Sequence, residues 1–344
     1  MNTFKYSFRN DYSELAHPQV LKALTDLEKK QFEGYGLDER SIKAAELIKT
    51  KINNPTADVH FISGGTQANL VVISSVLRPH EAVIACESGH IFVHEAGAIE
   101  ATGHKICTVK SNNGKLSAHD IEAIVNFHSD EHMVKPRLVF ISQSTELGSV
   151  YKKNELISIS ECCRRNKLYL YLDGARLGSG MNSFACDLLY DVTADLVDAF
   201  YIGGTKNGAL FGEAIVICND ALKEDFRFHL KQKGALIAKG ASIGAQFEAL
   251  FENDLYDELA IHAIDMALKL ANGIKKLGFE FLSEAETNQI FPIFPTTIVE
   301  KLHNLYEFYD WKQIDDNTAV RLVTSWATPE DMVDEFLNDL AREK

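Results

Sequence analysis

A lysine lies among glycines in residues 201–208, which read Tyr-Ile-Gly-Gly-Thr-Lys-Asn-Gly. The apolar run over residues 196–202 leads into this segment and is typical of a buried strand. Glycines permit a tight turn and let a ligand approach the backbone, and a desolvated lysine there loses its proton readily. Because a neutral amine forms a Schiff base with an aldehyde, Lys206 is a candidate catalytic residue. The alternative interpretation is a strand-to-loop turn that carries a solvated lysine.

The composition is ordinary for a globular protein. The chain has 344 residues, of which 46% are hydrophobic and 24% charged, and this length suits a large domain with a smaller one. The formal net charge of -14 disfavours nucleic acid as a partner. No apolar run reaches about 18 residues and the start lacks a signal-peptide pattern, so we expect no membrane segment. The six cysteines include no C-x-x-C spacing, which favours reduced thiols in a cytoplasmic protein.

Strand and helix patterns alternate through most of the first two thirds of the chain. The apolar runs that we interpret as strands cover residues 57–62, 82–86, 105–109, 137–143, 168–172, 196–202 and 213–218. Their alternation with helical segments predicts an α/β fold with a mostly parallel sheet and helices on both faces. Residues 220–277 show mainly helical periodicity, and residues 278–344 alternate shorter signals. We therefore expect an arm and a large domain over residues 1–250 and a small C-terminal domain over residues 251–344.

A glycine-rich segment, Ser63-Gly64-Gly65-Thr66, lies between the first predicted strand and a long helical run. Backbone N–H groups at the start of a helix suit a phosphate group. The segment is neither a P-loop nor a dinucleotide-binding fingerprint. A plain glycine turn, capped by Ser63 or Thr66, is the alternative.

An acidic residue, Asp173, directly follows the apolar strand over residues 168–172. This position is the carboxyl end of the sheet, where open α/β folds bind their ligands. A carboxylate there can hold the proton on a ring nitrogen. The alternatives are a helix cap or an ion pair with Arg176.

A histidine, His90, follows the strand over residues 82–86 and precedes a predicted helix over residues 91–101. Its flat ring can stack on a flat cofactor. A lone histidine is more often a satisfied structural residue, and His94, one helical turn later, is a second candidate for the same role.

Together these segments describe one cofactor. A phosphate, a protonated ring nitrogen, an aldehyde and a flat aromatic ring are the features of pyridoxal 5′-phosphate, whose expected protein partners are a lysine and a carboxylate. Asp173 and Lys206 follow neighbouring strand candidates, so both can face one crevice.

Five segments, in this order and spacing, carry a resemblance to a known family. They are residues 63–69 (Ser-Gly-Gly-Thr-Gln-Ala-Asn), 89–98 (Gly-His-Ile-Phe-Val-His-Glu-Ala-Gly-Ala), 173–176 (Asp-Gly-Ala-Arg), 205–208 (Thr-Lys-Asn-Gly) and 320–324 (Val-Arg-Leu-Val-Thr). Over nearly its whole length the chain resembles the low-specificity L-threonine aldolases, which belong to the β-eliminating lyases and the fold-type-I enzymes that use pyridoxal phosphate.

The resemblance implies a fold and a reaction. The expected fold is a three-layer α/β/α large domain with a mostly parallel seven-stranded sheet, plus a small α+β domain. The expected reaction cleaves L-threonine, L-allo-threonine or a related β-hydroxy-α-amino acid to glycine and an aldehyde. Another lyase reaction on the same cofactor, β-elimination, is an alternative, as is an aminotransferase. A protein that binds the cofactor without catalysis is a further alternative.

The resemblance also implies residue roles. Lys206 holds the cofactor aldehyde, Asp173 pairs with the pyridine nitrogen, and His90 stacks on the ring. The residues expected around the phosphate are Gly65, Thr66 and Gln67. Arg176 and Arg321 are expected to bind the substrate carboxylate, with Arg176 also near the cofactor, because the arginine fork fits a carboxylate bidentately. The alternatives are an ion pair of Arg176 with Asp173 or Asp187, and a surface charge for Arg321.

Several positions depart from the family pattern. Asn10 stands where the family has a serine that helps to bind the substrate carboxylate, and Glu146 stands in place of a histidine linked with the substrate hydroxyl. The catalytic base is therefore open between His90, Glu146, His94 and a water molecule. The resemblance implies a homotetramer, or at least a dimer, with shared active sites, in which Lys233 or Lys239 replaces an arginine that reaches the neighbouring phosphate. No metal is expected.

Overall fold

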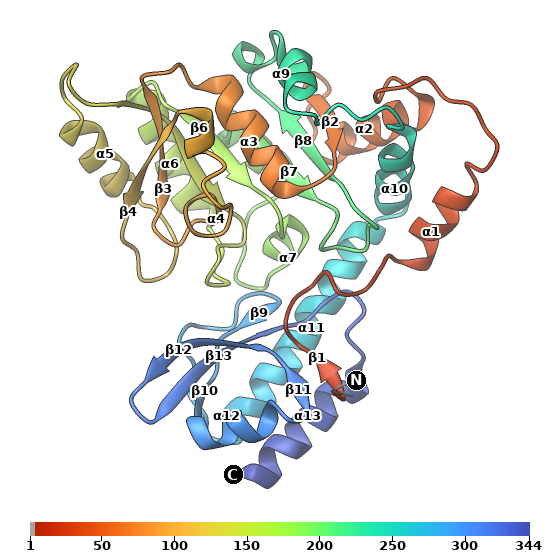
Figure 1. Ribbon diagram of the computed structural model, residues 1–344, viewed down its shortest axis with the longest axis vertical. Helices are drawn as coiled ribbons and strands as arrows, with labels where there is room; N and C mark the ends of the chain where they lie inside the picture. The colour runs from red at the N-terminus through yellow and green to blue at the C-terminus, as the bar shows by residue number, and fades with distance from the viewer. Residues whose placement is uncertain (1–3) are drawn as a thin grey trace.

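The computed structural model describes residues 4–344 and shows two lobes (Figure 1). The upper lobe is built on a seven-stranded sheet. Its strands, in spatial order, are β2 (Asp58–Ile62), β8 (Glu213–Ile217), β7 (Ala199–Gly203), β6 (Tyr169–Asp173), β5 (Lys135–Ser142), β3 (Glu81–Cys86) and β4 (Lys105–Val109). Strand β8 runs antiparallel to β2 and β7, and the other pairs are parallel. The predicted mostly parallel sheet is confirmed.

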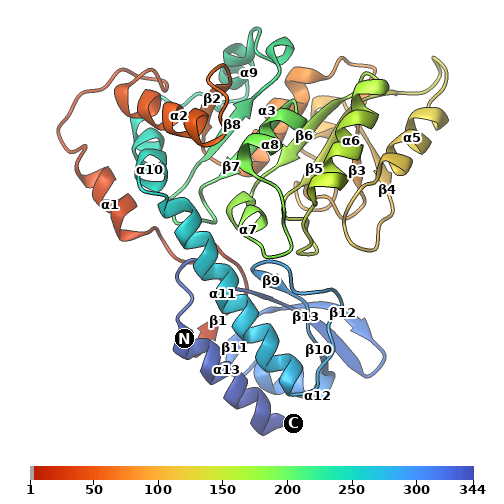
Figure 2. The ribbon, with the colours of Figure 1, turned by 180° about the vertical axis from the view of Figure 1, so that it is seen from behind.

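Helices cover both faces of this sheet. They are α1 (Pro18–Thr25), α2 (Glu39–Lys51), α3 (Gly65–Val76), α4 (His90–Val93), α5 (Ala118–Phe127), α6 (Lys153–Arg165), α7 (Leu177–Met181), α8 (Tyr190–Leu196), α9 (Phe226–Gln232) and α10 (Ala241–Phe251), with short 3-10 turns η1 (Glu100–Thr102) and η2 (Asp220–Leu222). In β6, Leu170 and Leu172 pack in the apolar cluster that includes α6 and α10, whereas Tyr171 packs in the cluster that includes α3 and α9. This alternation produces the three layers that Figures 1 and 2 show from opposite sides.

The lower lobe is the predicted small α+β unit. It contains most of α11 (Leu255–Lys276) and then β9 (Gln289–Ile290), β10 (Ile293–Pro295), α12 (Thr296–Leu302), β11 (Tyr306–Glu307), β12 (Tyr309–Ile314), β13 (Asn317–Val323) and α13 (Glu330–Glu343). Strand β13 pairs antiparallel with β9, β10 and β12. A separate apolar core joins Leu270 of α11, Val320 of β13 and Phe336 of α13. The first turns of α11 instead pack in the upper lobe through Leu255 and Leu259.

The N-terminal arm packs on the lower lobe before it crosses to the upper one. Strand β1 (Tyr6–Ser7) pairs in parallel with β11, and Phe8 is buried in the core of the lower lobe. The arm then leads to α1 beside α10 (Figure 1). The domain boundary at residue 250 stays a prediction. No helix within residues 4–344 is long and apolar enough to span a bilayer.

Local details differ from the sequence predictions. The helix predicted over residues 91–101 is wrong, because α4 ends at Val93 and only the short turn η1 follows. Between them, Ala96 (φ 51°) and Gly97 (φ 74°) have left-handed backbone conformations, which interrupt a right-handed helix. The strand predicted from residue 196 begins only at Ala199, since Leu196 closes α8.

Candidate active site

A cavity of about 500 Å³ lies where loops that follow several strands of the large sheet meet the β12–β13 hairpin. It is lined by Tyr12, His90, His94, Glu146, Arg176, Lys206, Tyr309, Asp310, Trp311 and Arg321. The loops after β3, β5, β6 and β7 each contribute a predicted residue, because parallel strands end at one edge of the sheet. Five of the predicted site residues therefore lie together around this cavity: His90, Glu146, Arg176, Lys206 and Arg321.

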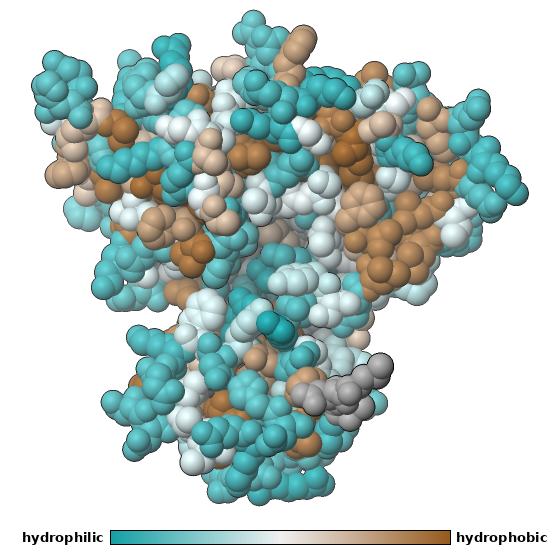
Figure 3. All heavy atoms as spheres, in the orientation of Figure 1, coloured by the Kyte–Doolittle hydropathy of each residue, from teal (hydrophilic) through white to brown (hydrophobic). Residues whose placement is uncertain are grey.

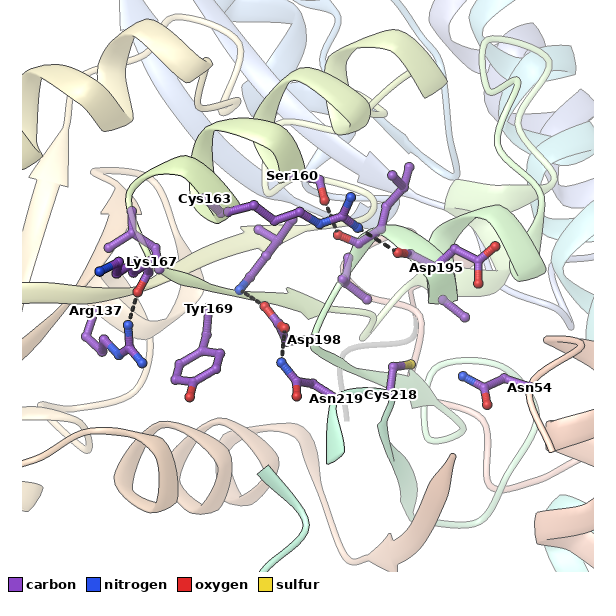
Figure 4. A pocket seen from close by; sticks show the side chains of 16 residues that line it. Asn54, Arg137, Ser160, Cys163, Lys167, Tyr169, Asp195, Asp198, Cys218 and Asn219 are labelled. Carbon is purple, nitrogen blue, oxygen red and sulfur yellow. Dashed lines mark hydrogen bonds between the residues drawn. The ribbon is translucent and has the colours of Figure 1, made fainter. Parts of the chain in front are cut away.

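A second cavity, of about 600 Å³, lies at the other end of the strands (Figure 4). Its lining includes Arg137 near the start of β5, Tyr169 at the start of β6 and Cys218 after the end of the antiparallel strand β8. It contains none of the predicted site residues. The cavity of about 500 Å³, which is lined by predicted site residues, is therefore the candidate active site.

Lys206 lies in the loop after β7, with its ammonium nitrogen 6.0 Å from the centre of the Tyr12 ring. Burial and the charge of Arg176 lower the pKa of Lys206, against the opposing charges of Asp11 and other acids. A lowered pKa makes the neutral amine more available as a nucleophile.

The loop that carries Lys206 is anchored by a buried acid. The backbone N–H of Gly204 donates to Oε2 of Glu213 at 2.8 Å. Burial raises the pKa of Glu213 to about 7, although hydrogen bonds from Thr205 and Gly204 act in the opposite direction.

Asp173 is 3% exposed and does not itself line the cavity, but its charge acts on the lining residues His90 and Lys206. We call Asp173 and its hydrogen-bond partners the floor of the site. Its Oδ1 accepts hydrogen bonds from Tyr201 Oη at 2.6 Å and Ala175 N at 2.9 Å. Its Oδ2 accepts one from Asn69 Nδ2 at 3.0 Å. Both oxygens are thus held in place by neutral donors, and no described cation within ion-pair distance neutralises the carboxylate.

His90 is bonded to an acid that the sequence analysis did not identify. Its Nδ1 lies 2.8 Å from Oε1 of the buried Glu95. Burial lowers the pKa of His90, but the hydrogen bond with Glu95 and the charges of Glu146 and Asp173 outweigh it, so the pKa is raised. His94 is exposed, with its ring centre 5.5 Å from that of His90.

The side chain of Arg176 is only 9% exposed and pairs with the N-terminal arm. Its Nε donates to Asp11 Oδ2 at 2.7 Å, and its Nη2 donates to Asp11 Oδ1 at 2.9 Å. The alternatives of an ion pair with Asp173 or Asp187 are wrong. Burial opposes ionisation of Asp11, but the charges of Arg176 and Lys206 prevail and lower its pKa. Arg176 therefore reaches the cavity with much of its charge already compensated.

Arg321 has a different environment. Its guanidinium carbon lies 5.0 Å from the ring centre of Tyr309 and 5.5 Å from that of Trp311. Its Nη2 donates weakly to the backbone oxygen of Arg9 at 3.5 Å, and its buried Nε has no partner within residues 4–344. No described carboxylate forms an ion pair with it. This arginine is available to bind an anion.

The predicted phosphate segment begins α3 at Gly65. Gly64 is the N-cap and forms no side-chain cap bond, so the alternative of a cap by Ser63 or Thr66 is wrong. The first-turn N–H groups are thus free to bind an anion. A Cβ at Gly65 would lie 2.9 Å from Tyr201 Oη, so the absence of a side chain lets α3 approach the floor.

Two further predicted site residues, Gln67 and Asn10, bind other parts of the protein. Gln67 accepts from Ser63 Oγ at 2.8 Å and donates to the backbone oxygen of Lys233 at 3.3 Å. Asn10 does not line the cavity: its Oδ1 accepts from Tyr12 N at 3.0 Å and from Ser13 Oγ at 2.9 Å. Asn10 therefore shapes the turn of the arm that carries Tyr12.

Sequence reasoning missed several residues of the site. They are Asp11, Asn69, Glu95, Tyr201, Tyr309 and Trp311. Asn69 and Glu95 lie inside the segments that carried the family resemblance, two residues after Gln67 and five after His90, so a polar residue in the same segment was the available signal. Asp11 adjoins Asn10, and no local pattern predicts its pairing with Arg176.

The fold and these residues define a cofactor-dependent enzyme of the α/β class. Residues 18–296 match the family model of the beta-eliminating lyases. The chain is 33% identical to the low specificity L-threonine aldolase of Pseudomonas sp. (strain NCIMB 10558), over 96% of this chain and 95% of that protein. A solved structure of Leishmania major threonine aldolase is 47% identical, with a TM-score of 0.97, over 98% of this chain and 99% of that one. The chain belongs to the beta-eliminating lyase family, as the resemblance predicted.

More distant structures share the fold alone. Aspartate aminotransferase from Thermus thermophilus is 14% identical, with a TM-score of 0.72, over 99% of this chain and 92% of that one. The predicted fold-type-I architecture is therefore confirmed.

Proposed function

We propose that this chain is a pyridoxal-phosphate-dependent carbon–carbon lyase. Its reaction cleaves L-threonine, L-allo-threonine or a related β-hydroxy-α-amino acid to glycine and an aldehyde. Membership of the beta-eliminating lyase family supports this proposal. The observation that carries it is the placement of Lys206, His90 and Arg321 around one cavity, with Asp173 beneath them.

The residues present fit pyridoxal phosphate. Asp173 would face the pyridine nitrogen with an oxygen pair already oriented by Tyr201 and Asn69. Lys206 would hold the aldehyde carbon, and His90 would lie against the ring. The phosphate would bind at the uncapped start of α3, formed by Gly65, Thr66 and Gln67. When bound, the cofactor supplies an electron sink for the bond that breaks at Cα.

The two arginines would divide the work on the substrate carboxylate. Arg321 lines the cavity without a carboxylate partner, so its full charge is available to the substrate. Arg176 already gives Nε and Nη2 to Asp11, which leaves Nη1 as its free edge. We therefore assign Arg321 as the main carboxylate ligand and Arg176 as the second.

A base must take the proton of the β-hydroxyl group before the aldehyde can leave. We assign this role to His90, with Glu146 as the second candidate, because both line the cavity. His94 is the third candidate but lies exposed on the same wall.

We also propose that the protein acts in the cytoplasm as a homo-oligomer with shared active sites. The free thiol state of its six cysteines supports a reducing compartment. Apolar side chains gather over α1 and α10 (Figure 3), around a hollow of about 400 Å³ lined by residues that include Leu24, Leu27 and Phe32. Such a surface suits a subunit interface. Sedimentation of the purified protein should show a dimer or tetramer, and a monomer would contradict the proposal.

The function is tested by products. Purified protein supplied with pyridoxal phosphate and either L-threonine or L-allo-threonine should form glycine and acetaldehyde in equal amounts. Ammonia with a keto acid would favour β-elimination, and transfer of the amino group to an added keto acid would favour an aminotransferase. A yellow protein that forms no product from either amino acid would favour a binding protein without catalysis.

A further inference from the structure

A chain of hydrogen bonds runs beneath the cavity from His90 to Asp173. Nδ1 of His90 lies 2.8 Å from Glu95 Oε1, and Nδ2 of Asn69 donates to the same oxygen at 2.7 Å. The same Asn69 nitrogen donates to Asp173 Oδ2 at 3.0 Å. The side chain of Glu95 is 0% exposed, so this acid acts only on its neighbours.

The direction of these bonds is fixed by a tyrosine. Tyr171 Oη donates to Oδ1 of Asn69 at 3.0 Å, which turns the amide nitrogen of Asn69 toward the two carboxylates. Oε1 of Glu95 is therefore an acceptor from Asn69. The imidazole is the stronger base of the His90–Glu95 pair, so the proton between them lies on Nδ1 of His90.

We propose that Glu95 is a positioning residue for this reaction: it keeps the proton on Nδ1 of His90, so that Nε2 of His90 takes the proton of the substrate β-hydroxyl group. This inference rests on the proposed function. His90 lines the cavity, and its Nε2 makes no hydrogen bond to any residue in the range 4–344. A carboxylate on one ring nitrogen that leaves the other free is the arrangement that makes histidine a base.

The proton and electron movements balance. The O–H bond breaks and its proton forms a bond to Nε2, while the O–H electron pair becomes the second bond of the aldehyde carbonyl. The Cα–Cβ bond breaks, and its electron pair stays with the glycine fragment. Cα later gains one proton, which equals the proton that His90 accepted, so His90 ends the cycle as it began.

Glu95 stabilises the positive charge that His90 gains when it accepts the proton. Other charged or titratable groups that face His90 are Glu146, Asp173, Lys206 and His94. Only Glu95 among the described residues bonds its ring directly. Burial raises the pKa of Glu95, and its hydrogen bonds to His90 and Asn69 oppose that change. Asn69 donates to both Glu95 and Asp173, so it links the acid beside His90 to Asp173.

The first test measures His90 without relying on turnover. The rate at which diethyl pyrocarbonate modifies His90, located by peptide mass spectrometry, is followed against pH in Glu95→Gln and in the matched control Glu100→Gln, with and without cofactor. Glu100 is exposed on the turn after α4. The apparent pKa of His90 should fall by about 1 unit or more in Glu95→Gln and stay unchanged in Glu100→Gln. Equal titrations in the two variants would overturn the inference, whatever the activity.

The second test follows the pH profile of kcat. In Glu95→Gln the acid limb should move to lower pH by the same shift, the plateau should fall about 10–100-fold, and KM should change less than about 3-fold. A purely structural role would lower kcat without moving the limb and would overturn the inference.

A third measurement needs only the unaltered chain, in case Glu95→Gln does not fold. Nitrogen-15 NMR of histidine-labelled protein, assigned with His90→Gln, should show neutral His90 protonated at Nδ1. Protonation at Nε2 would overturn the inference. If the unaltered protein instead forms no glycine, the proposed function fails, while both titration readouts of His90 remain available.

Discussion

The floor and the wall of the cavity are built by different means. In the floor, Asp173 is buried and every hydrogen bond to it comes from a fixed neutral donor. In the wall, Tyr309 is 36% exposed, and aromatic rings rather than an acid hold Arg321. Buried groups whose hydrogen bonds are all satisfied give preorganised electrostatics. The rings of Tyr309 and Trp311 against Arg321, which we call the aromatic clamp, are partly exposed and can adjust to a ligand. The floor is thus suited to the chemical step and the wall to binding the substrate.

This difference predicts that a change in the floor has the largest effect on turnover. Asp173→Asn keeps the shape of the side chain and removes the charge that we propose would face the pyridine nitrogen. We expect kcat to fall about 10²–10³-fold, with KM changed little, because this charge acts on the reacting system. Steady-state kinetics with saturating cofactor measures the effect. A rise in KM with unchanged kcat would place Asp173 with the binding residues.

The next prediction concerns the acid that anchors the lysine loop. Since the pKa of Glu213 is raised to about 7, the folded protein keeps a proton that the unfolded chain releases near pH 4.5. The free energy of unfolding contributed by this group therefore falls as pH rises from about 4.5 to about 7, by roughly 3 kcal/mol.

Glu213→Gln removes this titration. Urea unfolding at a series of pH values should show that the variant gains stability relative to the parent chain as pH rises through this window. A constant difference between the two proteins across the window would show that Glu213 titrates normally and does not carry a burial cost.

The two arginines that line the cavity are expected to respond differently to substitution. Arg321→Lys should raise KM for the amino acid about 10–100-fold, because a charged hydrogen-bonding fork is lost, and should leave thermal stability nearly unchanged. Arg176→Lys should instead lower the melting temperature, since it breaks the buried bidentate pair with Asp11. Kinetics and thermal melts of both variants are compared. The reverse pattern would contradict the assignment of Arg321 as the main carboxylate ligand.

The smallest expected effect lies in the aromatic clamp. Trp311→Leu removes one of the two rings against Arg321 and keeps an apolar side chain. KM should rise about 2–5-fold, as expected for a partly exposed cation–π contact, with kcat unchanged. Trp326→Leu, which changes the other tryptophan outside the cavity, is the matched control. Equal effects of the two substitutions would show that the ring of Trp311 does not support the binding of substrate by Arg321.

The sequence predicted the floor better than the wall. Lys206, Asp173 and His90 each follow an apolar strand, and parallel strands bring their ends together, so local patterns were sufficient. The wall depends on β12, whose side chains are largely exposed and show no apolar alternation. Its position in the site follows from long-range packing, which periodicity does not report.

Contacts between segments that are distant in the sequence could not be predicted from local patterns either. Asp11 and Arg176 lie 165 residues apart, and the arm that carries Asp11 is held on the lower lobe by the pairing of β1 with β11. The histidine network was closer to prediction, since Glu95 lies five residues after His90. The expected helix over residues 91–101 hid it, because a continuous helix would not place Glu95 under the ring in this way.

Our proposal requires that Lys206 holds pyridoxal phosphate in this cavity. The direct measurement adds the cofactor to the purified protein, reduces it with borohydride and locates the modified residue by peptide mass spectrometry, with the exposed Lys110 as an internal comparison. We expect stoichiometric modification of Lys206, with Lys110 unmodified. Modification spread over surface lysines, with Lys206 intact, would contradict it.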